Sequence, residues 1–222
     1  RFGVRIALAL CLLLPCKAAV ATCASGVDAG GGDDFDGACT APMAAEGGAG
    51  GAGLPATVRQ WIYDKRPEGE VSGDHYVLKE DAPMPTPGEG EVLLQMLFWS
   101  VDPYHRIQQS GKDTWEEPHP LGTVQGSGTV GRVVALGGGD VAGLAVGDIV
   151  SSYSGWQTHA VAKAAAVRKL DPSVAPVSTS LGALGMPART AYFGLLEVGA
   201  AKEGETVLVS GAAGAVGSMV VQ

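Results

Sequence analysis

Residues 206–222 constrain the fold most, because a strand pattern, a glycine turn and a helix pattern follow one another there. Residues 206–210 read TVLVS, a β-branched and apolar run that is typical of a strand buried in a parallel sheet. Glycine-rich residues 211–217 come next, and the small and apolar residues 218–222 can begin a helix. This order predicts the βα unit of a doubly wound domain, in which the turn binds a dinucleotide.

The glycines of this turn suit a pyrophosphate site for steric reasons. The turn must be tight, the backbone must approach the phosphates without a Cβ between them, and the helix must pack closely on its strand. The phosphates then lie at the helix N-terminus, where unpaired N–H groups attract an anion. Against G-x-G-x-x-G, Ala212 replaces the first glycine, while Gly214 and Gly217 match the others. Since 34 of 222 residues are glycine, a plain glycine-rich turn is the alternative, and the preceding strand favours the nucleotide site.

Composition excludes several classes of partner. The net charge is −8 and the pI about 4.9, with no basic stripe, so we expect no nucleic acid and no anionic membrane surface as the main partner. All cysteines precede residue 40, namely Cys11, Cys16, Cys23 and Cys39. A disulfide framework in the folded part is therefore excluded.

Residues 1–23 have the layout of a secretory signal or targeting peptide. Arg1 and Arg5 flank the start of an apolar run at 6–14, and residues 19–21 supply an A-x-A-like site. The run is too short for a bilayer, which takes about 20 apolar residues, so we expect no membrane span once the leader is removed. The leader suggests the secretory pathway or organelle import. The alternative is an apolar segment without a targeting role.

Residues 24–56 are rich in Gly, Ala and Asp and contain almost no large apolar residue. Such a composition cannot bury a core, so we interpret this segment as a disordered linker. The body of an organelle transit sequence is the alternative. Its acidic residues argue against that alternative, because transit sequences avoid them.

Folded sequence is predicted from residue 57. Strand patterns at 58–63, 75–78, 91–101, 128–135, 148–152 and 158–161 are separated by Gly and Pro turns, which predicts a β-barrel or sandwich over 57–184. The period then becomes helical at 177–185 and 188–196, and the strand at 206–210 follows. Residues 185–222 are therefore predicted to start an α/β domain.

Four strings, in this order, resemble one family. The family is the medium-chain dehydrogenase/reductase superfamily, and within it the zinc-free NADPH-dependent alkenal/one oxidoreductases, also called prostaglandin reductases or leukotriene B4 12-hydroxydehydrogenases. The resemblance covers residues 57–222. The strings are EVLL at 91–94 with VDPYHR at 101–106, GWQTHAV at 155–161, GMPARTAYFGLL at 185–196, and GAAGAVG at 211–217.

The resemblance implies a GroES-like β-barrel followed by the start of a Rossmann domain, with the active site in the cleft between them. It implies NADPH-dependent reduction of the carbon-carbon double bond of α,β-unsaturated aldehydes and ketones. Hydride goes to the β-carbon and a proton to the α-carbon. The family is mostly cytoplasmic, and a homodimer is possible.

The same comparison implies a set of site residues. Tyr104 would line the substrate cleft, and Met186 and Thr190 would lie near the nicotinamide. The alternatives are that Tyr104 caps a strand and that the other two pack on a helix face. His105 and Arg189 depart from the family pattern, and that puts substrate fit in question. The residues that would hold the NADPH pyrophosphate are Gly211, Gly214, Ala215, Val216 and Gly217.

No metal site is predicted. The zinc-dependent relatives carry Gly-His-Glu where this chain has Thr123, Val124 and Gln125, and they carry cysteines where this chain has none after Cys39. The histidines His75, His119 and His159 have no partners at metal-ligand spacing.

Two other functions stay open at this point, a quinone oxidoreductase of the same superfamily and a non-catalytic binding module. A doubly wound domain needs several more βα units of about 30 residues each, so we expect on the order of 100 further residues. The catalytic residues would then lie beyond Gln222, and the 222-residue chain alone is expected to be inactive.

Overall fold

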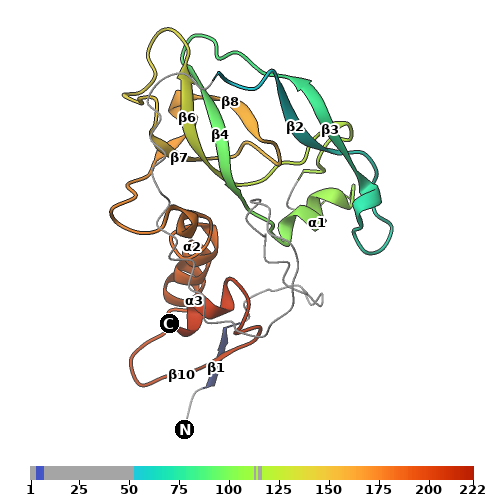
Figure 1. Ribbon diagram of the computed structural model, residues 1–222. Coiled ribbons are helices and arrows are strands. Elements are labelled where there is room, and N and C mark those ends of the chain that lie inside the picture. The colour runs from blue at the N-terminus through green and yellow to red at the C-terminus, as the bar shows by residue number, and fades with distance from the viewer. Residues whose placement is uncertain (1–3, 8–52, 113, 115–116) are drawn as a thin grey trace, which may run out of the picture. The chain divides into compact units, whose positions relative to one another are not determined.

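The computed structural model describes residues 4–7, 53–112, 114 and 117–222 (Figure 1). These residues belong almost entirely to one compact unit, formed by Arg1–Leu12 and Pro55–Gln222. The predicted linker lies outside the described residues up to residue 52, and so does the predicted leader apart from 4–7.

The larger sheet of the described chain has five antiparallel strands in the order β8-β4-β6-β7-β9. β4 is an interior strand between β8 and β6, and its run of Val, Leu and Met residues explains why most of its first six residues are buried. Register shifts interrupt its pairing with β6 and bend the strand. The strands are β4 Glu91–Trp99, β6 Thr129–Leu136, β7 Ile149–Ser152, β8 His159–Lys163 and β9 Arg168–Lys169.

A second sheet has the order β3-β2-β5, with β2 Thr57–Tyr63, β3 Tyr76–Pro83 and β5 Thr123–Val124. A short 3₁₀ helix, η1 Gly73–His75, leads into β3. The two sheets are joined where Trp61 N donates to Trp156 O at 2.9 Å and Gln60 bridges to Gln157. The predicted β domain is therefore confirmed, and β3 runs further than the expected 75–78.

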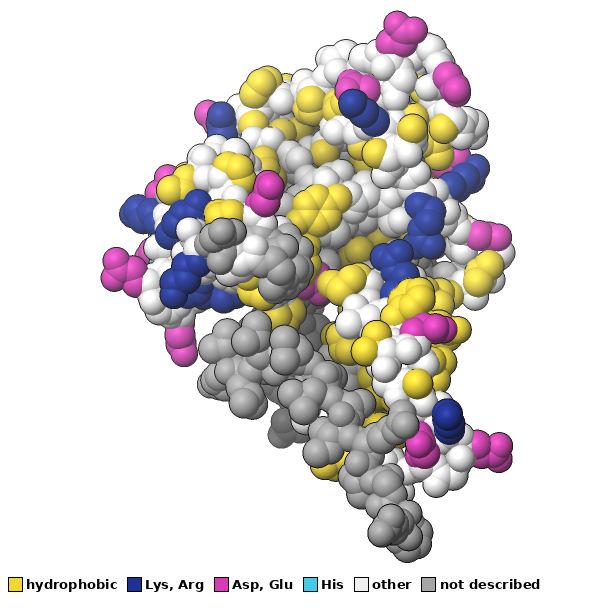
Figure 2. All heavy atoms as spheres, turned by 180° about the vertical axis from the view of Figure 1, so that it is seen from behind, with side chains coloured by type: hydrophobic (Ala, Val, Ile, Leu, Met, Phe, Trp, Pro, Cys, Tyr) yellow, Lys and Arg dark blue, Asp and Glu magenta, His cyan; other side chains and the backbone are white. Residues whose placement is uncertain are grey.

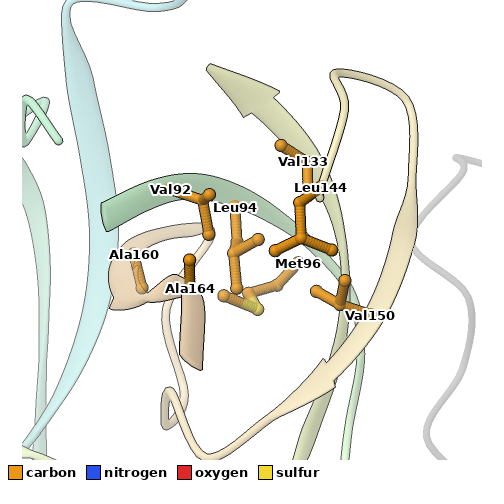
Figure 3. Packing of buried hydrophobic residues seen from close by; sticks show 8 residues of the cluster. All are labelled: Val92, Leu94, Met96, Val133, Leu144, Val150, Ala160 and Ala164. Atoms are coloured by element: carbon orange, nitrogen blue, oxygen red, sulfur yellow. The ribbon is translucent and has the colours of Figure 1, made fainter. Parts of the chain in front are cut away.

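The apolar core lies inside the larger sheet (Figure 3). Its side chains come from four strands, from the loop before β7 and from the 3₁₀ helix η2 Ala164–Ala166. Each fully buried Val, Leu or Met contributes about 1.5–3 kcal/mol to folding. Packing in this cluster holds the strands of the larger sheet together. Its members are Val92, Leu94, Met96, Val133, Leu144, Val150, Ala160 and Ala164.

A helix that the sequence analysis did not expect, α1 Tyr104–Gln109, follows β4. The strand was expected to continue to residue 101, and it ends at Trp99. Pro103 precedes the helix, a place where its fixed φ suits a helix start. Buried Tyr63 Oη donates to Gln109 O at 2.9 Å, and Gln109 Nε2 donates to Gln125 Oε1 at 3.0 Å. These bonds hold α1 against the second sheet, to which Tyr63 belongs.

The C-terminal part is helical up to its strand, as predicted. It contains the 3₁₀ helix η3 Val177–Leu181, the α-helix α2 Met186–Tyr192 and the π-helix η4 Phe193–Val198, followed by β10 Thr206–Val209 and α3 Gly217–Val221. Hydrophobic side chains are exposed on the surface of the molecule (Figure 2). In the C-terminal segment the exposed ones include Tyr192, Phe193 and Val198. The strand, turn and helix order thus agrees with the start of a Rossmann domain.

β10 pairs in parallel with β1 Val4–Ala7, from Val4 opposite Thr206 to Ala7 opposite Val209. Part of the predicted leader thus forms a strand. Its targeting role stays a prediction, since the rest of the leader lies outside the described residues. Among the residues that are described, no helix is both long and apolar enough to cross a bilayer.

Candidate active site

A cleft of about 920 Å³ opens where α1 and the end of the larger sheet adjoin η3 and α2. Tyr104, Met186 and Thr190 all line it. The sequence prediction placed these residues around substrate and nicotinamide, and the structure brings them together. The cleft wall also holds residues that the prediction did not select, chiefly Asp102, Ser152, Tyr153, Arg168 and Leu181.

Tyr104 is held at the cleft by its position at the start of α1. Its Oη donates to Tyr153 Oη at 3.2 Å, and its ring contacts the His105 ring at a centroid distance of 4.3 Å. The backbone before it is folded back, because Asp102 N donates to His105 Nδ1 at 3.2 Å and Ser100 Oγ donates to Asp102 Oδ2. Tyr104 therefore begins a helix, whereas the alternative had it capping a strand.

His105 supports Tyr104 from below and is itself buried. Burial lowers the pKa of His105 to about 4, with Asp102 opposing the shift and His119 adding to it. The imidazole is therefore neutral near pH 7. Its ring meets Trp156 edge-on at a centroid distance of 5.8 Å, and Nε2 has no hydrogen-bond partner among the described residues. His105 does not line the cleft. We therefore interpret it as a packing residue behind the cleft wall.

Met186 and Thr190 lie one helical turn apart on α2. Thr190 Oγ1 donates to Met186 O at 2.9 Å and lies 3.7 Å from Met186 Sδ. The buried residues of α2 are Pro187 and Ala191, on another side of the helix. Gly185 lets α2 begin close to η3, since a Cβ there would lie 2.3 Å from Ser180 O. The two predicted nicotinamide residues therefore point to the cleft, and their contact with the cofactor stays a prediction.

The glycine turn lies between β10 and α3 and does not line this cleft. Gly211 has φ +63°, a conformation that favours glycine. Gly214 N donates to Gly211 O at 2.9 Å, and Val216 precedes the first helical residue. Gly217 is buried, and a Cβ on it would lie 2.2 Å from Gly211 O. Residues 211–213 and Ala215 are exposed, so a pyrophosphate can reach the backbone of this tight turn. The turn therefore fits NADPH.

The described residues include no group of three or more His, Cys, Asp or Glu side chains that could hold a metal ion. Buried Gln125 takes part in the α1 hydrogen bonds described above and donates to Gly126 O at 3.0 Å. The histidines are engaged locally. His75 bonds Ser72, His119 lies 2.9 Å from Val124 O, and His159 lies 3.3 Å from Thr158 Oγ1.

Comparison with known proteins now places the chain. Residues 59–170 match the family described as the N-terminal domain of oxidoreductase. The chain belongs to the medium-chain dehydrogenase/reductase superfamily. The match falls within the predicted β domain, 57–184, and the expected family is confirmed, including its zinc-free, NADPH-dependent reductases.

Two curated relatives and one solved structure show the branch. NADPH-dependent curcumin reductase of Escherichia coli (strain K12) is 42% identical over 164 residues, 74% of this chain and 46% of the relative. Prostaglandin reductase 1 of Mus musculus is 40% identical over 167 residues, 74% of this chain and 47% of the relative. CurA from Vibrio vulnificus, solved with NADPH, is 39% identical with a TM-score of 0.67, covering 73% of this chain and 47% of that one.

The chain spans about half the length of the curated relatives it matches. The predicted fold, a GroES-like domain followed by the start of a Rossmann domain, is confirmed by this likeness. The findings also support NADPH as the cofactor, as predicted.

Proposed function

We propose that the complete protein uses NADPH to reduce the carbon-carbon double bond of α,β-unsaturated aldehydes and ketones. The observation that carries the proposal is the convergence of Tyr104, Met186 and Thr190 on one cleft. The relatives that are similar to this chain include proteins named curcumin reductase and prostaglandin reductase.

The residues of this chain would position the reactants. NADPH, when bound, supplies the hydride. The turn at Gly211, Gly214, Ala215, Val216 and Gly217 would hold its pyrophosphate, since Gly217 lets α3 begin close to the Gly211 backbone and the turn is tight.

Met186 and Thr190 would border the nicotinamide side of the cleft, and the hydrogen bond from Thr190 Oγ1 to the backbone oxygen of Met186 holds the Thr190 side chain in place. Tyr104 would border the substrate from the opposite wall of the cleft, because it belongs to α1 whereas Met186 and Thr190 belong to α2. The walls would thus hold the β-carbon against the hydride donor, and such orientation is a large part of the rate enhancement in reactions of this type.

The test is NADPH oxidation by the full-length protein with trans-3-nonen-2-one, 2-nonenal and a soluble quinone, each against NADH as the alternative donor. Turnover of the enone and alkenal with NADPH supports the proposal. Turnover confined to the quinone would favour a quinone oxidoreductase, and no turnover with any acceptor would favour a non-catalytic module.

A further inference from the structure

The first turn of α1 is closed by a reciprocal pair of hydrogen bonds between Asp102 and His105. The backbone N of His105 donates to Asp102 O at 3.1 Å, and the backbone N of Asp102 donates to His105 Nδ1 at 3.2 Å. The second bond is of the kind that a Glu or Gln side chain makes in a capping box, where it accepts from a backbone N–H three residues earlier. In this chain a histidine ring is the acceptor.

The same arrangement occurs at the 3₁₀ helix η1. There Ser72 N donates to His75 Nδ1 at 3.0 Å, and His75 N donates to Ser72 O at 3.3 Å. The spacing of three residues is identical, but the surroundings differ. The pair at η1 lies at the surface and does not line the cleft, whereas His105 is buried beside Tyr104, which does. The bond at η1 is therefore a natural reference for the bond at α1.

The bond to Asp102 determines where the His105 ring carries its hydrogen. A backbone N–H can only donate, so Nδ1 must present a lone pair to it, and the neutral ring holds its hydrogen on Nε2. Burial favours this neutral form, since it lowers the pKa of His105 to about 4, although the Asp102 carboxylate opposes the shift. His105 is therefore a hydrogen-bond acceptor near pH 7.

Two separate anchors hold α1, one at each end. Its last residue, Gln109, is bonded to the second sheet. At its start the Asp102 carboxylate accepts from Ser100 Oγ, and Ser100 N donates at 2.8 Å to the oxygen of the residue before β6. The His105 side chain joins the helix to this segment. Its loss would leave α1 attached at the Gln109 end and would loosen the end that carries Tyr104.

We propose that His105 is a positioning residue, whose Nδ1 holds the start of α1 and thereby places Tyr104 at the cleft wall. This inference rests on the proposed function, because it concerns how one residue of the proposed substrate cleft is held. The role goes beyond packing, since an apolar side chain of similar size could not accept from Asp102 N.

The experiment compares His105→Asn and His105→Leu with wild type in the full-length protein, using NADPH and trans-3-nonen-2-one. Asn keeps an acceptor oxygen near the place of Nδ1 and loses the ring, whereas Leu fills more of the space and cannot accept. We expect kcat/KM to fall about tenfold in His105→Leu, the size for one lost hydrogen bond, and less than about threefold in His105→Asn. A packing role predicts the reverse order, since Leu preserves more of the contact with Trp156.

Two further variants test whether the effect depends on Tyr104. In a Tyr104→Ala background, His105→Leu should lower kcat/KM less than about twofold, because the side chain that it positions is gone. His75→Leu removes the equivalent bond at η1 and is the matched control, which should behave as wild type. Equal losses in His105→Asn and His105→Leu, or an undiminished loss in the Tyr104→Ala background, would overturn the inference and leave the reductase proposal intact.

Amide hydrogen exchange tests the inference without any turnover. If wild type reduces no enone, alkenal or quinone, the proposed function fails, and exchange in residues 100–109 then decides whether Nδ1 holds the start of α1. Faster exchange in His105→Leu, with wild-type exchange in His105→Asn, would support this role. Equal exchange in the two variants would refute it.

Discussion

Replacing Gly217 by Ala should impair NADPH binding in the full-length protein through one methyl group. A Cβ at this position would lie 2.2 Å from Gly211 O, 2.8 Å from Gly211 C and 3.0 Å from Ala212 Cα. All three atoms belong to backbone, so no side-chain rotation can relieve the contact. Since carbon and oxygen atoms do not approach closer than about 3 Å, α3 or the turn must move by close to 1 Å.

A displacement of about 1 Å in a positioning element can cost on the order of a hundredfold in rate. We therefore expect NADPH affinity and kcat/KM with NADPH to fall by about that factor, measured by the change in NADPH fluorescence and by NADPH oxidation. Gly194→Ala is the matched control, since a Cβ there meets nothing within 4 Å, and it should behave as wild type. Gly217→Ala with unaltered NADPH affinity would show that the turn does not hold the pyrophosphate.

Three further predictions concern the β domain. Burial lowers the pKa of His105 to about 4 from 6.5. Between these pH values the unfolded chain therefore binds more protons at His105 than the folded chain does. The free energy of unfolding is thus unaffected by His105 above pH 6.5 and decreases as the pH falls toward 4. Urea unfolding at pH 7 and 4.5 should show a smaller pH dependence in His105→Met, and identical pH dependence would contradict this. Leu94→Ala should lower the free energy of unfolding by about 2–5 kcal/mol, because fully buried Leu94 belongs to the core cluster; a thermal melt within 1 °C of wild type would oppose it. Elemental analysis after dialysis should find no stoichiometric zinc, and one retained equivalent would reverse that conclusion.

Much of the β domain could be predicted because its strands alternate with glycine and proline turns. β2 and β7 fall within one residue of the expected ranges. β3 is longer than expected, since exposed polar residues 79–81 carry no strand pattern and are extended by pairing with β2. α1 was missed because the apolar run of β4 continues in sequence to Val101, and Pro103 was the signal that could have indicated a helix start.

The candidate site was predictable only where a motif carried it. Tyr104, Met186 and Thr190 lie in strings that resemble the family, and the structure places all three on the cleft wall. Tyr153 lies in a serine-rich turn without periodicity, so nothing in the local sequence distinguished it. Its place depends on the room above Gly126 and on Tyr104, two contacts that join segments far apart in the chain.

The support of α1 has a consequence for how this protein can change by mutation. Hydrogen bonds among Tyr63, Gln109 and Gln125 fix the helix that carries Tyr104, whereas the apolar cluster around Leu94 holds the larger sheet together. The two sets share no residue. Substitutions at Leu94 should therefore add nearly independently to substitutions in the hydrogen bonds that hold α1. Thermal robustness and substrate preference can thus be selected on separate positions, and a repacked sheet interior is a suitable background for altering the cleft.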